Sequence, residues 1–158
     1  MNFNKHITKN FTWNELFKSE IAIRYGIDNT TIDQDILNNI RLLTENILQP
    51  VRDKFGQIRI ASGYRCPEVN KLVGGSSNSN HVLGIAADIE PIDSDTKLVD
   101  ILTFIEKELD YHELIAEWFP NGWVHVAHKH YPRTLKIKDL DHNYEQVTLK
   151  YTQELYEI

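Results

Sequence analysis

The sequence has a single cysteine, Cys66, among 158 residues, so an intrachain disulfide is excluded. The fold must therefore be held together by packing, and it would tolerate a reducing compartment. No hydrophobic run approaches the roughly 20 apolar residues that a membrane-spanning helix needs. The opening segment MNFNKHITKNFTWNEL also lacks the apolar stretch of a secretion signal. We therefore expect cytoplasmic synthesis without a signal peptide, and delivery by another agent if the target lies outside the cell.

Excess positive charge is also missing, because 17 Lys and Arg stand against 23 Asp and Glu, for a net charge of −6. A sequence-independent nucleic-acid binder needs a basic face for phosphate contacts, so we expect no nucleic-acid partner. The 41% of apolar residues is ordinary for a globular protein. We expect one domain over residues 1–158, with a helical part at about 11–55, a strand-rich core at about 57–130 and a tail at 131–158.

Helical patterns fill the first third of the chain. A first helix is predicted over Thr12–Arg24, since its first residue and Glu15 have the spacing of a capping box. A long amphipathic helix is predicted from Ile32 to about Phe55, with apolar residues at helical spacing. Pro50 should kink this helix or split off its last turn, and Gly56 should end it.

Strand patterns dominate the chain after Gly56. The segment SGYRCPEVNKLVGGSSNSNH should begin as a turn and a short helix and end as a polar loop. A further helix, starting at a cap on Ser94 or Asp95, should run to about Asp110. The predicted strands are Gln57–Ala61, Ile85–Ile89, Glu113–Trp118, Trp123–His128 and Thr134–Ile137, with Phe119–Gly122 as a hairpin turn. The order of elements predicts an α+β fold, with N-terminal helices packed on one face of a mostly antiparallel sheet.

Two short segments carry metal-binding residue types. In SNHVLGIAAD, Asp88 lies on an apolar strand and must be paired or bound, because burying an unpaired charge is costly. In GWVHVAH, alternation puts His125 beside Trp123 on the face opposite the core. Taken singly, each residue has a plainer interpretation, since a histidine can be structural and Asp88 could pair with an arginine. Together with His81 they would form a three-ligand zinc site whose open fourth position holds water, the pattern of a catalytic centre.

Four blocks, in this order, resemble the zinc D-alanyl-D-alanine carboxypeptidase family. They are SGYRCPEVN (62–70), VGG (73–75), SNHVLGIAAD (79–88) and WVH (123–125). The family includes phage L-alanyl-D-glutamate endopeptidases and is similar in fold to the hedgehog signalling domain. The resemblance spans about Phe11 to His128. It implies a zinc peptidase domain with a hedgehog-like fold that cuts peptidoglycan stem peptides, as a D-Ala-D-Ala carboxypeptidase or an L-Ala-D-Glu endopeptidase.

The resemblance also implies roles for individual residues. The zinc ligands would be His81, Asp88 and His125. Arg65 would hold the substrate and steady the oxyanion, as suits a guanidinium near a carboxylate or a developing negative charge. Ser79 would hydrogen-bond substrate or orient its loop.

The general base is where the sequence departs from its relatives. Several relatives place an acidic residue three positions before the last histidine ligand, and here that position is Gly122. The resemblance then assigns the base to Glu117, which would take a proton from zinc-bound water and pass it to the leaving amine. Glu113 is the alternative, because alternation puts it on the same face. If neither reaches the metal, the protein would be a non-catalytic zinc-binding structural or virion protein.

The remaining candidates have structural interpretations. We expect His112 and His128 to be turn, structural or exposed residues, and Cys66 not to be a nucleophile. Asn70 should fix its loop by side-chain to backbone hydrogen bonds. Tyr64, like Trp123 in the substrate site, could pack in the core or form a cleft wall.

The missing signal peptide and the single expected domain suit a phage or prophage lytic enzyme that acts on the cell wall after release or is carried in the virion. A bacterial cytoplasmic enzyme, or one exported by an unconventional route, is the alternative. We expect a monomer or a component of a phage particle. Peptidoglycan peptides would be its substrate.

Overall fold

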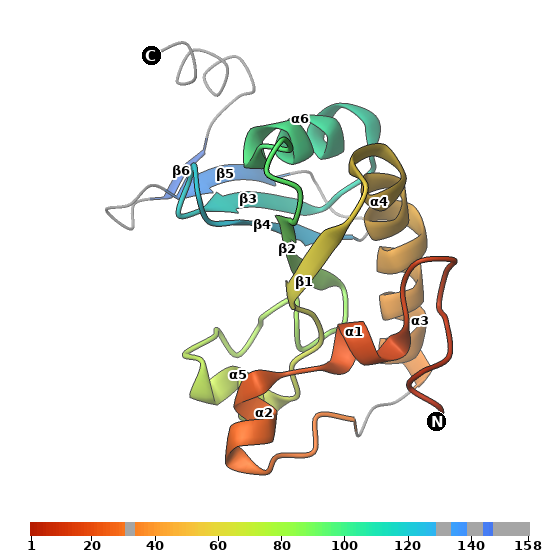
Figure 1. Cartoon of the computed structure of the whole chain (residues 1–158). Helices are drawn as coiled ribbons and strands as arrows, with labels where there is room; N and C mark the ends of the chain where they lie inside the picture. The colour runs from red at the N-terminus through yellow and green to blue at the C-terminus, as the bar shows by residue number, and fades with distance from the viewer. Residues whose placement is uncertain (31–33, 129–133, 139–143, 147–158) are drawn as a thin grey trace.

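A six-stranded sheet with the order β1-β2-β4-β3-β5-β6 lies at the centre of the fold (Figure 1). The computed structural model describes residues 1–30, 34–128, 134–138 and 144–146. Neighbouring strands pair antiparallel, except that β5 runs parallel to β3. The strands are β1 (Ile58–Ser62), β2 (Ala86–Pro91), β3 (Glu113–Glu117), β4 (Trp123–Ala127), β5 (Thr134–Lys138) and β6 (Tyr144–Gln146). The predicted α+β class with a mostly antiparallel sheet is confirmed.

The helices come mainly before the sheet in the chain. They are α1 (Trp13–Phe17), α2 (Glu20–Tyr25), α3 (Gln34–Leu43), the π-helical turn η1 (Thr44–Leu48), α4 (Gln49–Phe55), α5 (Pro67–Leu72) and α6 (Leu98–Glu108). Within the described part of the chain, no helix is both long and apolar enough to cross a membrane.

The predicted single first helix is wrong, because the chain breaks into α1 and α2 at Lys18, whose backbone is extended. The capping interaction that begins α1 is present: the Thr12 N–H donates to Glu15 Oε2 at 2.7 Å. A second cap then begins α2, where Ser19 Oγ accepts the N–H of Ala22 at 3.2 Å. A serine that satisfies the first free N–H groups of a new helix favours a break over continuation.

The long predicted helix is present as α3, η1 and α4 in succession, with its first predicted residues, 32–33, outside the described part. Its irregularity is the π-helical turn that comes just before Pro50. Proline has no N–H to donate and its ring crowds the preceding turn, so a wider turn relieves both problems. Thr44 lies at the start of that turn and donates its hydroxyl to the Ile40 carbonyl at 2.7 Å. Gly56, with φ at +75°, ends α4 as predicted.

Most of the predicted strand and helix ends differ from the structure by one to three residues, and two of these differences have a visible cause. Helix α6 is not capped by Ser94 or Asp95; its N-cap is Lys97, whose N–H donates to Asp100 Oδ2 at 3.1 Å. The predicted cap is wrong because the helix begins only at Leu98, after a local turn in which the Asp95 N–H donates to Asp93 Oδ1 at 2.9 Å. Strand β3 ends at Glu117 rather than at Trp118, since Trp118 has φ at +57°.

The two faces of the sheet have different partners. Helix α6 packs against β2, β3 and β4, and α4 packs against β1 and α6. The buried strand residues that join this hydrophobic core are Ile58, Ala87, Ile89, Leu114, Ala116, Val124 and Val126. Because alternate residues point to opposite faces, the intervening Asp88, Ile115 and His125 lie on the other face, as predicted for His125. Asp88 and His125 are therefore carried on strands whose opposite face is packed by helices.

Candidate metal centre

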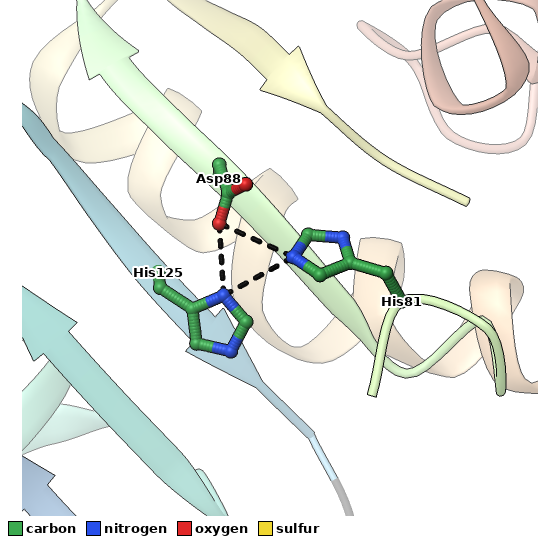
Figure 2. A group of neighbouring side chains, drawn as sticks. All are labelled: His81, Asp88 and His125. Atoms are coloured by element: carbon green, nitrogen blue, oxygen red, sulfur yellow. Dashed lines mark hydrogen bonds and ion pairs between the residues drawn. The ribbon is translucent and has the colours of Figure 1, made fainter. Parts of the chain in front are cut away.

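Three side chains from separate segments converge on one point (Figure 2). His81 comes from the loop before β2, Asp88 from the middle of β2 and His125 from the middle of β4. His81 Nε2 lies 3.2 Å from His125 Nδ1 and 3.3 Å from Asp88 Oδ1. His125 Nδ1 and Asp88 Oδ1 are 2.8 Å apart. The predicted ligand set is therefore brought together, with one donor atom from each residue.

The size of this triangle fits zinc. Zinc binds histidine nitrogen and carboxylate oxygen at about 2.0–2.2 Å in tetrahedral geometry, which spaces neighbouring donors by roughly 3.3 Å. Two of the three observed edges match that spacing, and the third would lengthen slightly. His81 and His125 are 1% and 7% exposed, so the donors are shielded from water on most sides. Three ligands leave a fourth position for a water molecule or substrate atom.

The other nitrogen of each imidazole faces a fixed acceptor. His81 Nδ1 is 2.7 Å from the Gly63 carbonyl oxygen, and His125 Nε2 is 3.5 Å from Glu113 Oε2. A hydrogen bond donated by one ring nitrogen leaves the lone pair of the other available to a metal. Both rings are therefore oriented with their metal-binding nitrogen towards Asp88.

The pKa values of Asp88 and His125 are shifted in opposite directions by their surroundings. Burial tends to raise the pKa of Asp88, but the neighbouring His81 and His125 outweigh it and hold that pKa well below its ordinary value. Burial tends to lower the pKa of His125, yet the hydrogen bond to Asp88, followed by the influence of Glu113, raises it to about 9. A negative carboxylate thus lies within a group that attracts either a proton or a cation.

The metal group lies in a cleft of about 570 Å³. The cleft is also lined by all the other predicted site residues, which are Arg65, Ser79, Glu117, Trp123 and the alternative base Glu113. Ser79 Oγ accepts the N–H of His81 at 3.3 Å, so the serine orients the loop that carries a ligand. The structure therefore brings the whole predicted set into one cavity.

Arg65 is held in the cleft by the backbone on either side of it. The Tyr64 N–H donates to the Leu16 carbonyl at 2.7 Å, and the Cys66 N–H donates to Asn29 Oδ1 at 2.8 Å. Burial lowers the pKa of Arg65, while the negative charges of Asp88 and Glu117 oppose this shift. An arginine side chain nevertheless keeps its charge in proteins.

Two buried N–H groups in the cleft lack a hydrogen-bond acceptor among the described residues. They are Arg65 Nε and Trp123 Nε1. Buried polar groups are nearly always hydrogen-bonded in native proteins. Because both residues line the cleft, these donors fit a ligand that brings oxygen atoms into it.

The hairpin between β3 and β4 explains why residue 122 is a glycine. Glu117 pairs with Trp123, and Gly122 folds back against the end of β3. A Cβ on Gly122 would collide with the Glu117 carbonyl oxygen and crowd the Trp118 side chain. This turn has no room for an acidic side chain at residue 122, and the acid that lines the cleft from the hairpin is Glu117.

The remaining predicted residues have structural places. Tyr64 is 3% exposed and packs edge-on against Phe17, so it belongs to the core, whereas Trp123 lines the cleft. Asn70 donates to the Ser76 carbonyl at 2.8 Å and fixes its loop as expected. His128 is partly exposed, with Nδ1 3.2 Å from the Asp110 carbonyl oxygen.

Three supporting residues were not singled out from the sequence. Gly63 accepts from His81 and lies so close to Leu16 that a Cβ would collide with the Leu16 backbone. Asn29 is 4% exposed and donates to the Tyr64 carbonyl at 3.0 Å. Asn80 donates to Glu113 Oε2 at 3.0 Å. Gly63 lies in the block SGYRCPEVN and Asn80 directly precedes His81, which are the sequence signals that could have found them. Asn29 has no such signal, since contacts across the fold leave no local pattern.

Comparison with known proteins agrees with this site. The sequence model of the family described as Peptidase M15 matches residues 9–127, which include every residue of the metal group and of the cleft described above. No curated protein sequence matches the chain at a significant level.

Proposed function

The chain belongs to the Peptidase M15 family, and from this premise we propose that it is a zinc-dependent peptidase acting on peptidoglycan stem peptides. The observation that carries the proposal is the convergence of His81, Asp88 and His125 in a cleft that also contains a half-buried arginine and a glutamate. A peptidase needs to polarise a carbonyl, activate water and protonate an amine, and this set contains a group for each task.

The metal group would hold zinc through His81 Nε2, Asp88 Oδ1 and His125 Nδ1. When bound, zinc supplies Lewis-acid chemistry, polarising the scissile carbonyl and making a water molecule acidic enough to react near neutral pH. Glu117 lines the same cleft and would take a proton from the attacking water, then deliver it to the leaving amine nitrogen. Its place at the end of β3, beside the hairpin, holds this carboxylate on the metal-binding face of the sheet.

Arg65 and Trp123 would bind the substrate. The half-buried Arg65 guanidinium suits a substrate carboxylate or the negative charge that develops on the carbonyl oxygen. The Trp123 indole N–H suits a peptide carbonyl, which would satisfy a buried donor. Stem peptides offer both groups along a short chain. The cut bond would be of the D-Ala-D-Ala or the L-Ala-D-Glu type, with the protein acting on the wall after release or from a phage particle.

The direct test is to incubate zinc-loaded protein with purified peptidoglycan and with D-Ala-D-Ala and L-Ala-D-Glu peptides, and to identify products by mass spectrometry. We expect metal-dependent release of new amino groups from one peptide type. Glu117→Gln should lower kcat by about 10²–10⁴-fold while zinc content stays the same. Glu90→Gln is the control, because Glu90 lies on β2 but pairs with Arg59.

The alternative is a zinc-binding protein without catalysis, suggested by the glycine at position 122. Failure of the wild-type protein to release amines, where another peptidase of the same family works, would overturn the catalytic proposal. The structural role would instead be favoured if the wild-type protein binds zinc and if His81→Ala and Glu117→Gln bind the cell wall as well as the wild type does.

A further inference from the structure

Glu113 lies beside the metal group but on the far side of His125 from Asp88. It is the first residue of β3, on the same face as Ile115, which pairs directly with His125. Glu113 Oε2 is 3.5 Å from His125 Nε2, whereas Asp88 Oδ1 is 2.8 Å from His125 Nδ1. The imidazole is thus flanked by a carboxylate at each nitrogen, and only the Nδ1 side faces His81.

Asn80 holds the Glu113 carboxylate in this place. Its Nδ2 donates to Glu113 Oε2 at 3.0 Å, the same oxygen that faces His125. The backbone carbonyl of Asn80 also accepts the Ile85 N–H at 3.1 Å, which fixes the residue near the start of β2. Because Asn80 directly precedes His81, the Glu113 carboxylate links the loop of one ligand to the strand of another.

We propose that Glu113 is a positioning residue for the metal centre: it accepts the Nε2 proton of His125 and is itself held by Asn80. A neutral imidazole carries one N–H, and a metal needs the lone pair of the other nitrogen. An acceptor at Nε2 keeps the proton there and leaves Nδ1 to face Asp88 and His81. Metal-binding histidines commonly donate their second nitrogen to such an outer partner, which also makes the ligand more basic.

The two histidines solve the same problem with different acceptors. His81 uses the Gly63 backbone carbonyl at 2.7 Å, which the chain holds rigidly. His125 uses a side chain, so its acceptor must be fixed by a further contact, and Asn80 supplies it. Glu113 is therefore assigned to positioning rather than to proton transfer with substrate. This role rests on the proposed metal site, but not on the proposed peptide hydrolysis.

The test measures zinc affinity by competition with a chromophoric chelator for Glu113→Ala, Glu113→Gln and Asn80→Ala. Glu90→Gln is the matched control, because the Glu90 side chain is 21% exposed, close to 22% for Glu113, and lies next to Arg59 instead of a ligand. Long-range proton–nitrogen NMR of the zinc-loaded protein would report which nitrogen of His125 carries the proton. Neither measurement depends on turnover.

We expect Glu113→Ala to weaken zinc binding about 10–100-fold, the usual cost of losing an outer partner. Glu113→Gln should weaken it less, because the amide oxygen can still accept, and Asn80→Ala should fall between them. The NMR signal should show a protonated Nε2 in the wild type. Zinc affinity in Glu113→Ala within two-fold of the Glu90→Gln control, a protonated Nδ1, or a wild type that binds no zinc would each overturn the proposal.

Discussion

Asp88 and His125 are direct cross-strand partners in the antiparallel pairing of β2 with β4. The register of the sheet therefore brings their side chains together, with Oδ1 and Nδ1 only 2.8 Å apart. Both strands are packed on their other face by the core, which fixes the backbone from which the two side chains project. A metal would thus meet two of its ligands already in place, and only the His81 loop needs separate support.

Removing a ligand should abolish stoichiometric zinc binding. His81→Ala and His125→Ala each remove one of the three converging donors, and two donors hold zinc poorly. We expect the loss of affinity to exceed the roughly 100-fold that removal of an outer partner causes. Elemental analysis after dialysis measures this. His6 is exposed and far in sequence from the three ligands, so His6→Ala should keep the wild-type zinc content. Equal zinc content in all the variants would contradict the assignment of the ligands.

The stability of the metal-free protein should fall as pH rises above neutrality. The folded state raises the pKa of His125 to about 9 from an ordinary 6.5. A raised pKa means that the stabilisation is complete below about pH 6.5 and is lost as pH rises through about 9, by on the order of 3 kcal/mol. Urea unfolding at pH 6.5 and 9.5, without zinc, measures the loss. The free energy of unfolding should fall much less between these two pH values in His125→Gln than in the wild type. An equal fall in both proteins would rule this explanation out.

Acid should remove the stabilisation that ionised Asp88 gives to the folded protein. The pKa of Asp88 is lowered in the folded state, so its stabilisation is complete above its ordinary value of 3.8 and disappears as pH falls below that. Asp88→Asn should therefore flatten the acid limb of the stability curve. Asp53 has a lowered pKa but is exposed, so Asp53→Asn should change the limb little. A curve for Asp88→Asn as steep as the wild type would contradict this.

Gly122→Ala should damage the hairpin and the activity together. Its Cβ would collide with the Glu117 carbonyl, and forcing an extra methyl into a packed site costs about 1–3 kcal/mol. Because Glu117 would have to shift, we expect kcat to fall more than KM changes. Gly26→Ala is the control: Gly26 has φ at +66° but nothing within 4 Å of a Cβ, so only about 1 kcal/mol of backbone strain is expected. Unaltered kcat in Gly122→Ala would count against the role of this turn.

Asn29→Ala should destabilise the loop that carries Arg65. Asn29 donates to the Phe17 and Tyr64 carbonyls and accepts from the Cys66 N–H, so its loss leaves buried polar groups unpaired. The expected cost is about 1–3 kcal/mol. Because Arg65 lies between two of these partners, KM for the substrate should also rise. Asn39→Ala, which removes one exposed bond to the Leu83 carbonyl, should do neither.

Much of the sheet could be predicted from the sequence because alternation is a local property. The pattern in WVHVA places His125 opposite the core whatever the neighbouring strands are, and the structure confirms it. The break at Lys18 was not predictable in the same way, since Thr12 and Ser19 both offer caps and tertiary packing decides between one helix and two. A kink at Pro50, or a separate last turn, was predicted, whereas the structure has a π-helical turn just before this proline.

The outer part of the site lay beyond the sequence for a physical reason. The contact between Asn80 and Glu113 joins residues 33 positions apart, and that between Asn29 and Tyr64 joins residues 35 apart. Such contacts depend on strand register and loop path, which no periodicity encodes. The resemblance to a family supplied the ligands and Arg65, but not the residues that support them.

The close approach of Gly63 to Leu16 makes the helical N-terminal part a structural wall of the metal site. Leu16 in α1 accepts from Tyr64, while the neighbouring Gly63 carbonyl accepts from His81. A shortened chain beginning at β1 would lose this wall and would not be a minimal enzyme. Conversely, zinc binding should slow hydrogen exchange of the Tyr64 amide, because the adjacent Gly63 carbonyl contacts the ligand His81. Exchange at this amide, which is bonded to the first helix, would therefore report whether zinc is bound.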